Sequence, residues 1–509
     1  MTKKLFTFLT LICLSVFLSA QSIEDKLVDR LKEYAQINTQ SESDVDTVPS
    51  TRKQCGLAAL LVDELRLMGL PEENMELDAS DTGHCIVYAT IKGNVKTAPT
   101  VFISAHLDTY PLEPMEGHPV VVIHDYEGGD IVINEEHPEL TLTQDKDEFL
   151  KDAVGGKVIT SDGNTILGGD DKAGMAVVMT LAETFIQNPS IPHGDIRIIF
   201  TPDEEVGNST TYLTKESIGA DFGLVIDSHG FGRLLVGNFN AANFTFDVRG
   251  LAGFDAYNGM PSPYRVASNF TANFPKELAA YRTSGLEGYV DHHDLGKVNE
   301  SANQVVVKGR LRSFTLEELN EYKEMVAAWA KATADDAISD YKKEKHNMKY
   351  ITVINGVADG EYNEGDLAII FTMKDSYYNA KYVLDRYPTN FRLIQNAFNA
   401  AGVTMMPEQG RGGSDAGDIT YLGIPTYNLF DGSHNEHSKN EWVSSKQMLA
   451  SYNVAYNYLT AMGGQDKNRM LQEGEELNET ITPIKSLDFL IKSIYKKLTG
   501  RYGNSLSNQ

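Results

Sequence analysis

The stretch Thr160-Ser-Asp-Gly-Asn-Thr-Ile-Leu-Gly-Gly-Asp-Asp-Lys-Ala-Gly174 places two carboxylates, Asp170 and Asp171, directly after a pair of glycines. The run Ala173–Phe185 that follows is apolar and predicts a buried helix. Glycines let the backbone turn sharply, and the N-terminus of a helix stabilises negative charge. Two interpretations are open for these aspartates, an ordinary helix cap or a carboxylate that faces a binding cleft. The rest of the chain decides between them.

Four further polar segments each follow a run that is typical of a buried strand. They are His106-Leu-Asp108 after Thr100–Ala105, Glu204-Glu205 after Asp195–Phe200, Asp227 after Phe222–Ile226, and His437 after Thr426–Phe430. Such strands alternate with helical patterns, which predicts a doubly wound α/β sheet. In sheets of this kind ligands gather at the carboxyl ends of the strands, so we expect these side chains to lie close together.

The residue types in these segments suit metal-dependent hydrolysis. His106 and Asp108 are two residues apart, so a strand places both on one side, where Asp108 can hold the second ring nitrogen of a ligating histidine. A His-x-Asp pair also arises by chance. Glu204 and Glu205 cannot both face one point, so one can bind a metal while the other acts as general base. A solvated acidic turn would have the same sequence.

Two histidines and three carboxylates at successive strand ends together predict a site for two metal ions. The predicted ligands are His106, Asp170, Glu205, Asp227 and His437. Imidazole and carboxylate ligands suit zinc, with cobalt or manganese as alternatives. We expect Asp170 to bridge two zinc ions that lie roughly 3.5–4 Å apart. His106 and Asp227 would complete the coordination of one ion, and Glu205 and His437 that of the other. Asp171 is then expected to be the helix cap.

The pattern changes between the α/β segments. The predicted elements there are a strand at Asn243–Arg249, a helix at Pro263–Tyr281, a strand at Gln304–Arg312, a helix at Leu316–Tyr341 and a strand at Leu367–Met373. This order predicts a small ferredoxin-like α+β lobe inserted into the α/β domain. We therefore expect a catalytic domain at 21–237 and 377–463, a lid or dimerisation domain at 238–376, and a C-terminal extension at 464–509.

Residues 1–20 have the pattern of a signal peptide. Lys3 and Lys4 precede the apolar run Leu5–Leu18, and small residues follow at Ser19 and Ala20. The apolar run is too short for a stable membrane span. We therefore expect an exported protein, periplasmic or secreted.

Composition and cysteines add two limits. The formal net charge is −26 with no visible basic face, which argues against a nucleic-acid partner. Cys55 and Cys85, which remain beyond the N-terminal segment, can form one disulfide but no disulfide framework.

The chain resembles the M20 metallopeptidases, and within them the peptidase T group of tripeptide aminopeptidases, over about residues 25–463. The stretches that carry the resemblance are Ala105–Thr109 (AHLDT), Tyr126–Ile131 (YEGGDI), Ile159–Gly174, Thr201–Gly207 (TPDEEVG), Lys374–Asn379 (KDSYYN), Arg411–Gly417 (RGGSDAG) and Gly423–Phe430 (GIPTYNLF). The metal-ligand motifs are similar across the wider family. YEGGDI and KDSYYN point more narrowly to peptidase T.

The resemblance implies roles for these residues. The five predicted ligands match the zinc ligands of the family, and Asp108 and Glu204 match its two catalytic carboxylates, with Glu204 as general base. The implied fold is a zinc-peptidase-like α/β domain with an inserted lid domain, and a homodimer through the lid is implied as well. Arg411 is a candidate for pairing with a substrate carboxylate, and a structural salt bridge is the alternative.

One segment departs from the family pattern. The family has an Asn-x-x-His-Pro-Gly segment after the first lid strand, whose histidine helps to stabilise the oxyanion, but residues 250–259 contain no histidine. His229, His292 and His293 are candidates to replace it, and surface or structural roles are the alternative for each. The Asp227-Ser-His-Gly segment also stands where the family has Asp-Gly-Gly. These departures put substrate choice and catalytic strength in question, not the metal site.

We therefore expect a zinc-dependent aminopeptidase that hydrolyses the N-terminal residue from short peptides, tripeptides in particular. Another M20 amidohydrolase, either a dipeptidase or an N-acyl amino acid hydrolase, is the first alternative. A non-catalytic zinc-containing protein that binds peptides is the second. The intact Glu204 argues against a pure binding protein, and the missing lid histidine argues for one.

Overall fold

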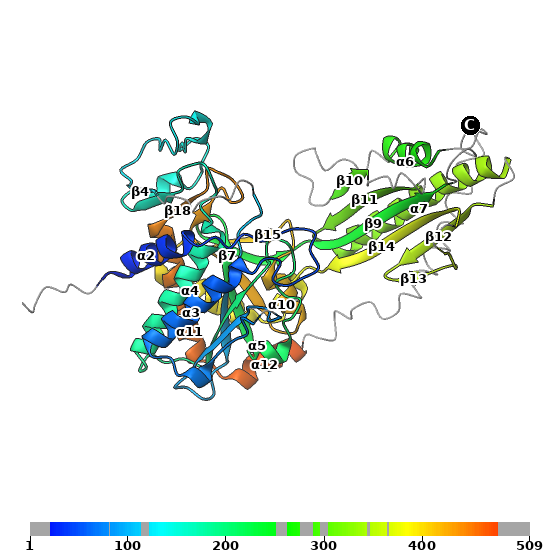
Figure 1. The fold of residues 1–509 in the computed structure, drawn as a ribbon. Coiled ribbons are helices and arrows are strands. Elements are labelled where there is room, and N and C mark those ends of the chain that lie inside the picture. The colour runs from blue at the N-terminus through cyan, green and yellow to red at the C-terminus, as the bar shows by residue number, and fades with distance from the viewer. Residues whose placement is uncertain are drawn as a thin grey trace, which may run out of the picture. The chain divides into compact units, whose positions relative to one another are not determined.

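The computed structural model describes residues 21–476 except for 81, 113–121, 251–261, 275–288, 296–303, 344–346 and 364–365. The predicted signal peptide and most of the predicted C-terminal extension therefore lie outside the described residues. The chain forms two compact units (Figure 1). The first comprises the described residues of Met1–Val236, Val383–Glu408 and Ile419–Glu475, and the second those of Gly237–Tyr382, Gln409–Asp418 and Glu476–Gln509.

The first unit is built on an eight-stranded sheet with the order β1-β2-β6-β3-β7-β16-β8-β15. Its strands are β1 (Met75–Leu77), β2 (Val87–Ile91), β3 (Val101–His106), β6 (Ile196–Thr201), β7 (Phe222–Ser228), β8 (Arg233–Asn238), β15 (Met406–Gly410) and β16 (Thr426–Phe430). The four central strands β6, β3, β7 and β16 run parallel to one another. Their carboxyl ends therefore lie along one edge of the sheet, as the doubly wound pattern predicts.

Helices pack on this sheet, with α4 at the centre of the unit. The helices of the first unit are α2 (Ile23–Ala35), α3 (Lys53–Met68), α4 (Gly169–Gln187), α5 (Lys215–Ile218), α9 (Pro388–Ala401), α11 (Ser445–Gly463) and α12 (Lys467–Glu476), and the short helices α8 (Lys381–Leu384) and α10 (Asp415–Tyr421) lie where the chain passes between the units. Helix α4 contacts α2, α11, β3 and β7, and all its residues from Ala173 to Ala182 are buried, which confirms the predicted buried helix.

Helix α12 lies in the segment 464–509, which we predicted to be a C-terminal extension. The Lys467 ammonium lies 2.9 Å from the Asp221 carboxylate. The Glu473 carboxylate accepts hydrogen bonds from the Thr389 backbone N–H at 3.2 Å and from the Thr389 hydroxyl at 2.6 Å. The first part of the extension is therefore packed on the first unit.

A four-stranded sheet, ordered β17-β18-β5-β4, lies in the same unit. Its strands are β4 (Val122–Asp125), β5 (Lys157–Thr160), β17 (Ser433–His434) and β18 (Trp442–Ser444), and the short 3₁₀ helices η1 (Glu72–Asn74), η2 (Pro138–Leu140) and η3 (Leu150–Ala153) lie in the loops of this unit. A small apolar cluster around Leu142, Leu150 and Trp442 supports this sheet. Because β18 pairs with β5, the sheet connects the loop that carries His437 to the strand that leads into the stretch Thr160–Gly174.

The second unit contains a six-stranded sheet, ordered β10-β11-β9-β14-β12-β13, together with α6 and α7 (Figure 1). The apolar side chains of the sheet share a core with those of α6 and α7. The elements of this unit are β9 (Asn240–Arg249), α6 (Pro263–Ala272), β10 (Tyr289–Leu295), β11 (Gln304–Ser313), α7 (Leu316–Lys343), β12 (Lys349–Ile354), β13 (Val357–Ala358) and β14 (Ala368–Tyr377). The predicted α/β domain with an inserted α+β lid is confirmed. Helix α6 ends earlier than predicted, and β10, β12 and β13 were missed. Strand β10 is polar and β13 is very short, and such strands form only by pairing with their neighbours. The sequence of β12, KYITVI, has the β-branched and aromatic residues typical of a strand, and the prediction overlooked it.

Candidate metal centre

Polar side chains gather at the carboxyl edge of the central parallel strands in the first unit. His106 is the last residue of β3, Asp227 is the penultimate residue of β7, and Glu205 follows β6. Asp170 comes from the start of α4, and His437 from the loop between β17 and β18. The structure thus brings together all five residues that the sequence singled out as metal ligands.

Asp170 lies at the centre of this group, and its side chain is 5% exposed. Its Oδ1 is 2.9 Å from Nε2 of His106. Its Oδ2 is 3.1 Å from Nε2 of His437 and 3.8 Å from Nε2 of His229. The two oxygens of one carboxylate therefore face different imidazoles, which is the arrangement needed to bridge two cations.

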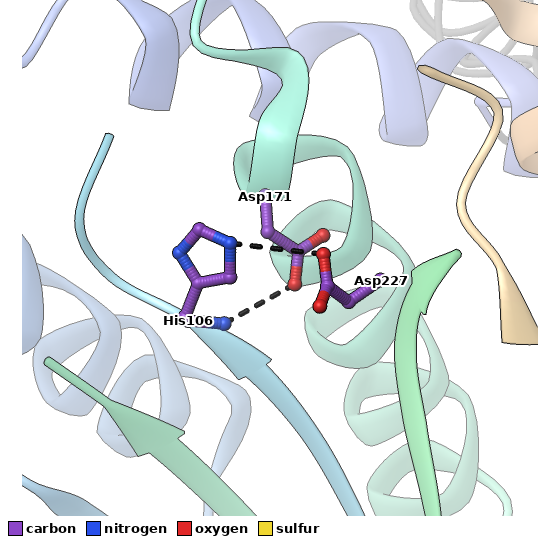
Figure 2. Close-up of side chains that lie close together, drawn as sticks. All are labelled: His106, Asp171 and Asp227. Atoms are coloured by element: carbon purple, nitrogen blue, oxygen red, sulfur yellow. Dashed lines mark hydrogen bonds and ion pairs between the residues drawn. The ribbon is translucent and has the colours of Figure 1, made fainter. Parts of the chain in front are cut away.

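The remaining candidate ligands divide between these two sides. Nε2 of His106 lies 3.7 Å from Oδ1 of Asp227, and Figure 2 shows this contact as a dashed line. On the other side, Nε2 of His437 lies 2.8 Å from Oε2 of Glu205. The second oxygen of Glu205, Oε1, is buried and has no hydrogen-bond partner among the described residues.

These residues fit a metal centre by spacing and by chemistry. Zinc bonds of about 2.0–2.2 Å in a tetrahedral site put neighbouring ligand atoms roughly 3.3 Å apart. The contacts of Asp170 with His106 at 2.9 Å and with His437 at 3.1 Å, and that of Asp227 with His106 at 3.7 Å, bracket this spacing. A cation would also provide a partner for the buried Oε1 of Glu205.

The carboxylates and imidazoles of the group shift one another's pKa values. Burial alone would raise the pKa of Asp170, but the imidazoles of His229, His106 and His437 outweigh burial and hold it well below its ordinary value. Burial and the nearby Asp170 carboxylate raise the pKa of Glu205 to about 7. Burial would lower the pKa of His437, but Asp170 and Glu205 raise it to about 11. The buried carboxylates thus favour positively charged neighbours, and metal cations would supply such charge.

Asp108 is fully buried behind His106 and the two glutamates. Nδ1 of His106 lies 3.1 Å from the backbone carbonyl oxygen of Asp108 and 3.3 Å from its Oδ1, so Asp108 provides the ring-orienting contact that the sequence predicted. The same carboxylate accepts hydrogen bonds from the backbone N–H groups of Glu204 at 2.9 Å and Glu205 at 3.2 Å. Asp108 therefore holds one candidate ligand and the turn that carries another.

Asp171 has a different role from its neighbour. Neither Asp170 nor Asp171 has helical backbone angles, so the regular part of α4 starts after them. The Asp171 carboxylate accepts the backbone N–H of Gly174 at 3.1 Å, which caps the helix, and that of His106 at 3.1 Å (Figure 2). A Cβ at Gly174 would lie 2.0 Å from the carbonyl oxygen of Ile226, so only glycine lets α4 approach β7 this closely.

Sequence reasoning missed two residues that hold this group in place. The buried Glu441 carboxylate accepts the backbone N–H groups of Gly168 at 2.7 Å and Asp170 at 2.9 Å, and burial raises its pKa to about 8. The ring of Tyr110 stacks on that of His437, with centroids 4.1 Å apart. Glu441 lies 271 residues from Asp170, so no local pattern could have paired them.

The remaining candidates fall in different places. His229, considered as a replacement for the lid histidine, lies in the first unit with Nδ1 3.0 Å from the Ser433 hydroxyl. Burial would lower its pKa, but Asp170 and other carboxylates raise it to about 9. Residues 251–259 and the side chains of His292 and His293 lie outside what the structure describes. Arg411 belongs to the second unit, where its guanidinium carbon is 5.6 Å from the Phe239 ring centroid, and its substrate role stays a prediction.

Comparisons with known proteins agree with this architecture. The chain is 34% identical over 423 residues to peptidase T of Halothermothrix orenii, covering 82% of this chain and 94% of the relative. It is 32% identical over 438 residues to peptidase T of Alkaliphilus oremlandii, covering 84% and 97%.

Solved structures share the fold. Aminopeptidase PepT from Bacillus cereus matches with a TM-score of 0.60 at 20% identity, covering 86% of this chain and 98% of that one. A tripeptidase from Staphylococcus aureus matches with a TM-score of 0.62 at 19% identity, covering 87% and 99%.

The predicted signal peptide and the predicted exported location are wrong in the light of the relatives. The proteins named peptidase T, which match over 94% and 97% of their own lengths, contradict both predictions. A short basic start followed by apolar residues is a pattern of composition that other N-terminal segments share, so the pattern by itself does not establish export. Among the helices that the structure describes, none is long and apolar enough to cross a membrane.

The family assignment rests on the greater part of the chain. The model of the family described as Peptidase family M20/M25/M40 matches residues 161–461. That range includes Asp170, Glu204, Glu205, Asp227 and His437. The chain therefore belongs to the peptidase family M20/M25/M40.

Proposed function

We propose that this protein is a two-zinc aminopeptidase that removes the N-terminal residue from short peptides, tripeptides in particular. The observation that carries the proposal is the central Asp170, whose two oxygens face His106 on one side and His437 on the other. The solved structures named as an aminopeptidase and as a tripeptidase, which share the fold, support the choice of substrate.

His106 and Asp227 would hold one zinc ion, Glu205 and His437 the other, and Asp170 both. Zinc bound there would polarise the scissile carbonyl and activate the attacking water. The dinuclear count is supported by the separation of the ligands into two sides. It is also the count named for an M20 peptidase of Bacillus subtilis that shares the fold, with a TM-score of 0.53.

The remaining work is done by carboxylates of the chain. Glu204 accepts the proton of the attacking water and passes it to the leaving amine. Asp108 keeps Nδ1 of His106 in place and holds the turn that carries Glu204 through the backbone N–H groups of residues 204 and 205. The buried Asp108 carboxylate thus connects His106 with the turn that carries Glu204, and the proposed chemistry depends on both.

Hydrolysis of a peptide panel by the purified, zinc-loaded protein tests the proposal. The panel contains di-, tri- and tetrapeptides with free N-termini, together with N-acyl amino acids, and the products are identified by mass spectrometry. We expect release of the N-terminal residue, fastest from tripeptides. Fastest turnover of dipeptides or N-acyl amino acids would instead indicate one of the other M20 reactions, and no turnover by a protein holding two zinc ions would indicate a binding protein.

The Glu204→Gln variant tests the mechanism. It keeps the size of the side chain but removes the base, so we expect kcat to fall by about 10²–10⁴-fold while two zinc ions stay bound. Glu216→Gln, a change in the first turn of the short helix α5, is the matched control and should leave kcat unchanged. Wild-type activity in Glu204→Gln would rule out this residue as the base.

A further inference from the structure

Asp203 is fully buried between the end of β6 and the Glu204–Glu205 turn, although it is not among the candidate ligands. Its backbone has φ of +60°, in the left-handed region that non-glycine residues rarely adopt. This backbone angle sets the direction in which the next residue, Glu204, leaves the strand. The conformation of the turn therefore depends on whatever holds Asp203.

The Asp203 side chain is held by the start of α3. Its Oδ2 accepts the backbone N–H of Ser50 at 2.5 Å, and its Oδ1 accepts the Ser50 hydroxyl at 2.6 Å. Oδ1 also accepts the Gln54 amide at 2.6 Å, and the amide oxygen of Gln54 accepts the backbone N–H of Asp203 at 3.1 Å. Hydrogen bonds to a buried carboxylate are among the stronger ones, so these contacts fix both the side chain and the backbone of Asp203.

Ser50 and Gln54 form a clamp on Asp203, and this clamp is itself anchored to the sheet. Gln54 is fully buried, and its neighbour Cys55 forms a disulfide with Cys85, with the Cα atoms 5.2 Å apart. Cys85 shortly precedes β2, whose Val87 pairs with Phe200 near the end of β6. The start of α3 is therefore tied to the same strand end from which Asp203 and Glu204 emerge.

The Glu204–Glu205 turn is thus held by hydrogen bonds from two segments of the chain. Asp108, beyond the end of β3, accepts the backbone N–H groups of Glu204 and Glu205, and the start of α3 holds Asp203. We propose that Asp203 is a positioning residue, which Ser50 and Gln54 hold so that Glu204 is oriented for proton transfer. This inference rests on the proposed aminopeptidase function, because it requires Glu204 to act as the base.

The Asp203→Asn variant is the primary test, with tripeptide hydrolysis and zinc content measured on the same samples. Asparagine keeps the size but replaces one acceptor oxygen with a donor amide that would face the donors of the clamp. We expect kcat to fall about 10–100-fold with KM within about twofold of the wild-type value, because small misplacements of a catalytic group can cost about 10²-fold. Two zinc ions per chain should remain bound.

The matched control is Asp195→Asn at the opposite end of β6. Asp195 accepts the Gly93 backbone N–H at 2.9 Å and the Lys92 ammonium at 3.0 Å, so it is also a hydrogen-bonded carboxylate next to this strand. Strand β6 separates it from the Glu204–Glu205 turn, and we expect the kcat of this variant to equal the wild-type value. A similar loss in both variants would show a general effect on the sheet and would overturn the inference.

The Gln54→Leu variant removes the two contacts of Gln54 with Asp203 while leaving Asp203 and Ser50 in place. It should lower kcat to a similar extent, and the double variant with Asp203→Asn should be little worse than either alone, since both changes break one interaction. If Asp203→Asn does not fold, as judged by circular dichroism, Gln54→Leu and Ser50→Ala decide the question through the same split between kcat and KM.

The outcomes separate this inference from the proposed function. An unchanged kcat in folded, zinc-loaded Asp203→Asn would overturn the positioning role. Loss of zinc, or a rise in KM that accounts for the whole effect, would assign Asp203 to the metal site or to substrate binding and would also overturn it. A wild-type protein that cleaves no peptide would contradict the proposed function instead.

Discussion

Two buried regions of this protein, one in each unit, contain opposite kinds of side chain. At the carboxyl edge of the first sheet the buried groups include carboxylates, namely Asp108, Asp170, Asp171, Asp203 and Glu441. Under the second sheet they are apolar, and the core contains Phe244, Phe246, Phe270 and Phe371. The first unit has concentrated charge where chemistry is proposed, and the second has a conventional hydrophobic core.

The difference shows what a functional site requires of its fold. A buried carboxylate is destabilising unless hydrogen bonds or cations compensate for the lost hydration. Asp108 and Glu441 each receive two backbone N–H groups from segments far along the chain. Buried phenylalanines need no such partners, because removing apolar surface from water is favourable in itself. Substitutions should therefore damage function in the first region and stability in the second.

The largest effect is expected for Asp170→Asn. Asparagine keeps the shape, but its uncharged amide replaces one of the two carboxylate oxygens that face His106 and His437. At least one zinc ion should therefore be lost. We expect kcat/KM on tripeptides to fall by about 10³-fold, equivalent to losing roughly 4 kcal/mol of transition-state stabilisation. Zinc content by mass spectrometry and peptide hydrolysis measure both effects.

Asp162→Asn is the control for that variant, because Asp162 lies in the same stretch and interacts locally with Asn164. It should keep two zinc ions and full activity. An Asp170→Asn protein that retains two zinc ions and full activity would remove the carboxylate bridge from the proposed mechanism.

Next in size is Phe246→Ala in the second unit. Phe246 is fully buried and stacks on Phe270 with ring centroids 4.3 Å apart, so its truncation should lower the free energy of unfolding by about 3–5 kcal/mol. The chain has two tryptophans, of which Trp329 lies in this unit. Urea unfolding followed by Trp329 fluorescence in a Trp442→Phe background therefore reports on the correct region.

Asn243→Ala, an exposed change on the same strand, should shift the free energy of unfolding by less than about 0.5 kcal/mol. The folded Phe246→Ala protein should bind zinc as tightly as the wild type. Weaker zinc binding in this variant would contradict the expectation that substitutions in the second region affect stability alone.

The smallest expected effect is a pH dependence that arises at His434, beside the candidate metal centre. Burial lowers the pKa of His434 to about 3, whereas in the unfolded chain it is about 6.5. Below pH 6.5 the unfolded chain therefore binds a proton that the folded protein excludes, so stability present above that pH is lost as the pH falls. The slope is about 1.4 kcal/mol per pH unit for one such group.

Between pH 7.5 and 5.5 the wild type should lose about 1–2 kcal/mol more than a His434→Gln variant. The ring of His434 stacks on that of Trp442, with centroids 4.1 Å apart. Urea unfolding of metal-free proteins, followed by Trp442 fluorescence in a Trp329→Phe background, measures the difference. Equal pH dependence in the two proteins would show that His434 is accessible to protons in the folded state.

Much of the architecture could be predicted from local patterns. The apolar runs that end at His106, Thr201 and Asp227 predicted parallel strands, and strand ends in such a sheet meet at one edge. The predicted helices at Ala173–Phe185 and Leu316–Tyr341 are present as α4 and α7. Local composition was insufficient for β10 and β13, and it led to a wrong prediction of export.

The sequence by itself determined the α/β class, the inserted lobe and the five candidate ligands, because strand periodicity and apolar runs are local properties of the chain. Only the tertiary structure showed that Glu441 and Gln54 hold the loops of the site. The Glu441 carboxylate accepts the backbone N–H of Asp170, 271 residues away, and the Gln54 amide oxygen accepts that of Asp203, 149 residues away. Such hydrogen bonds depend on the register in which distant segments pack, and no local pattern of residues encodes that register.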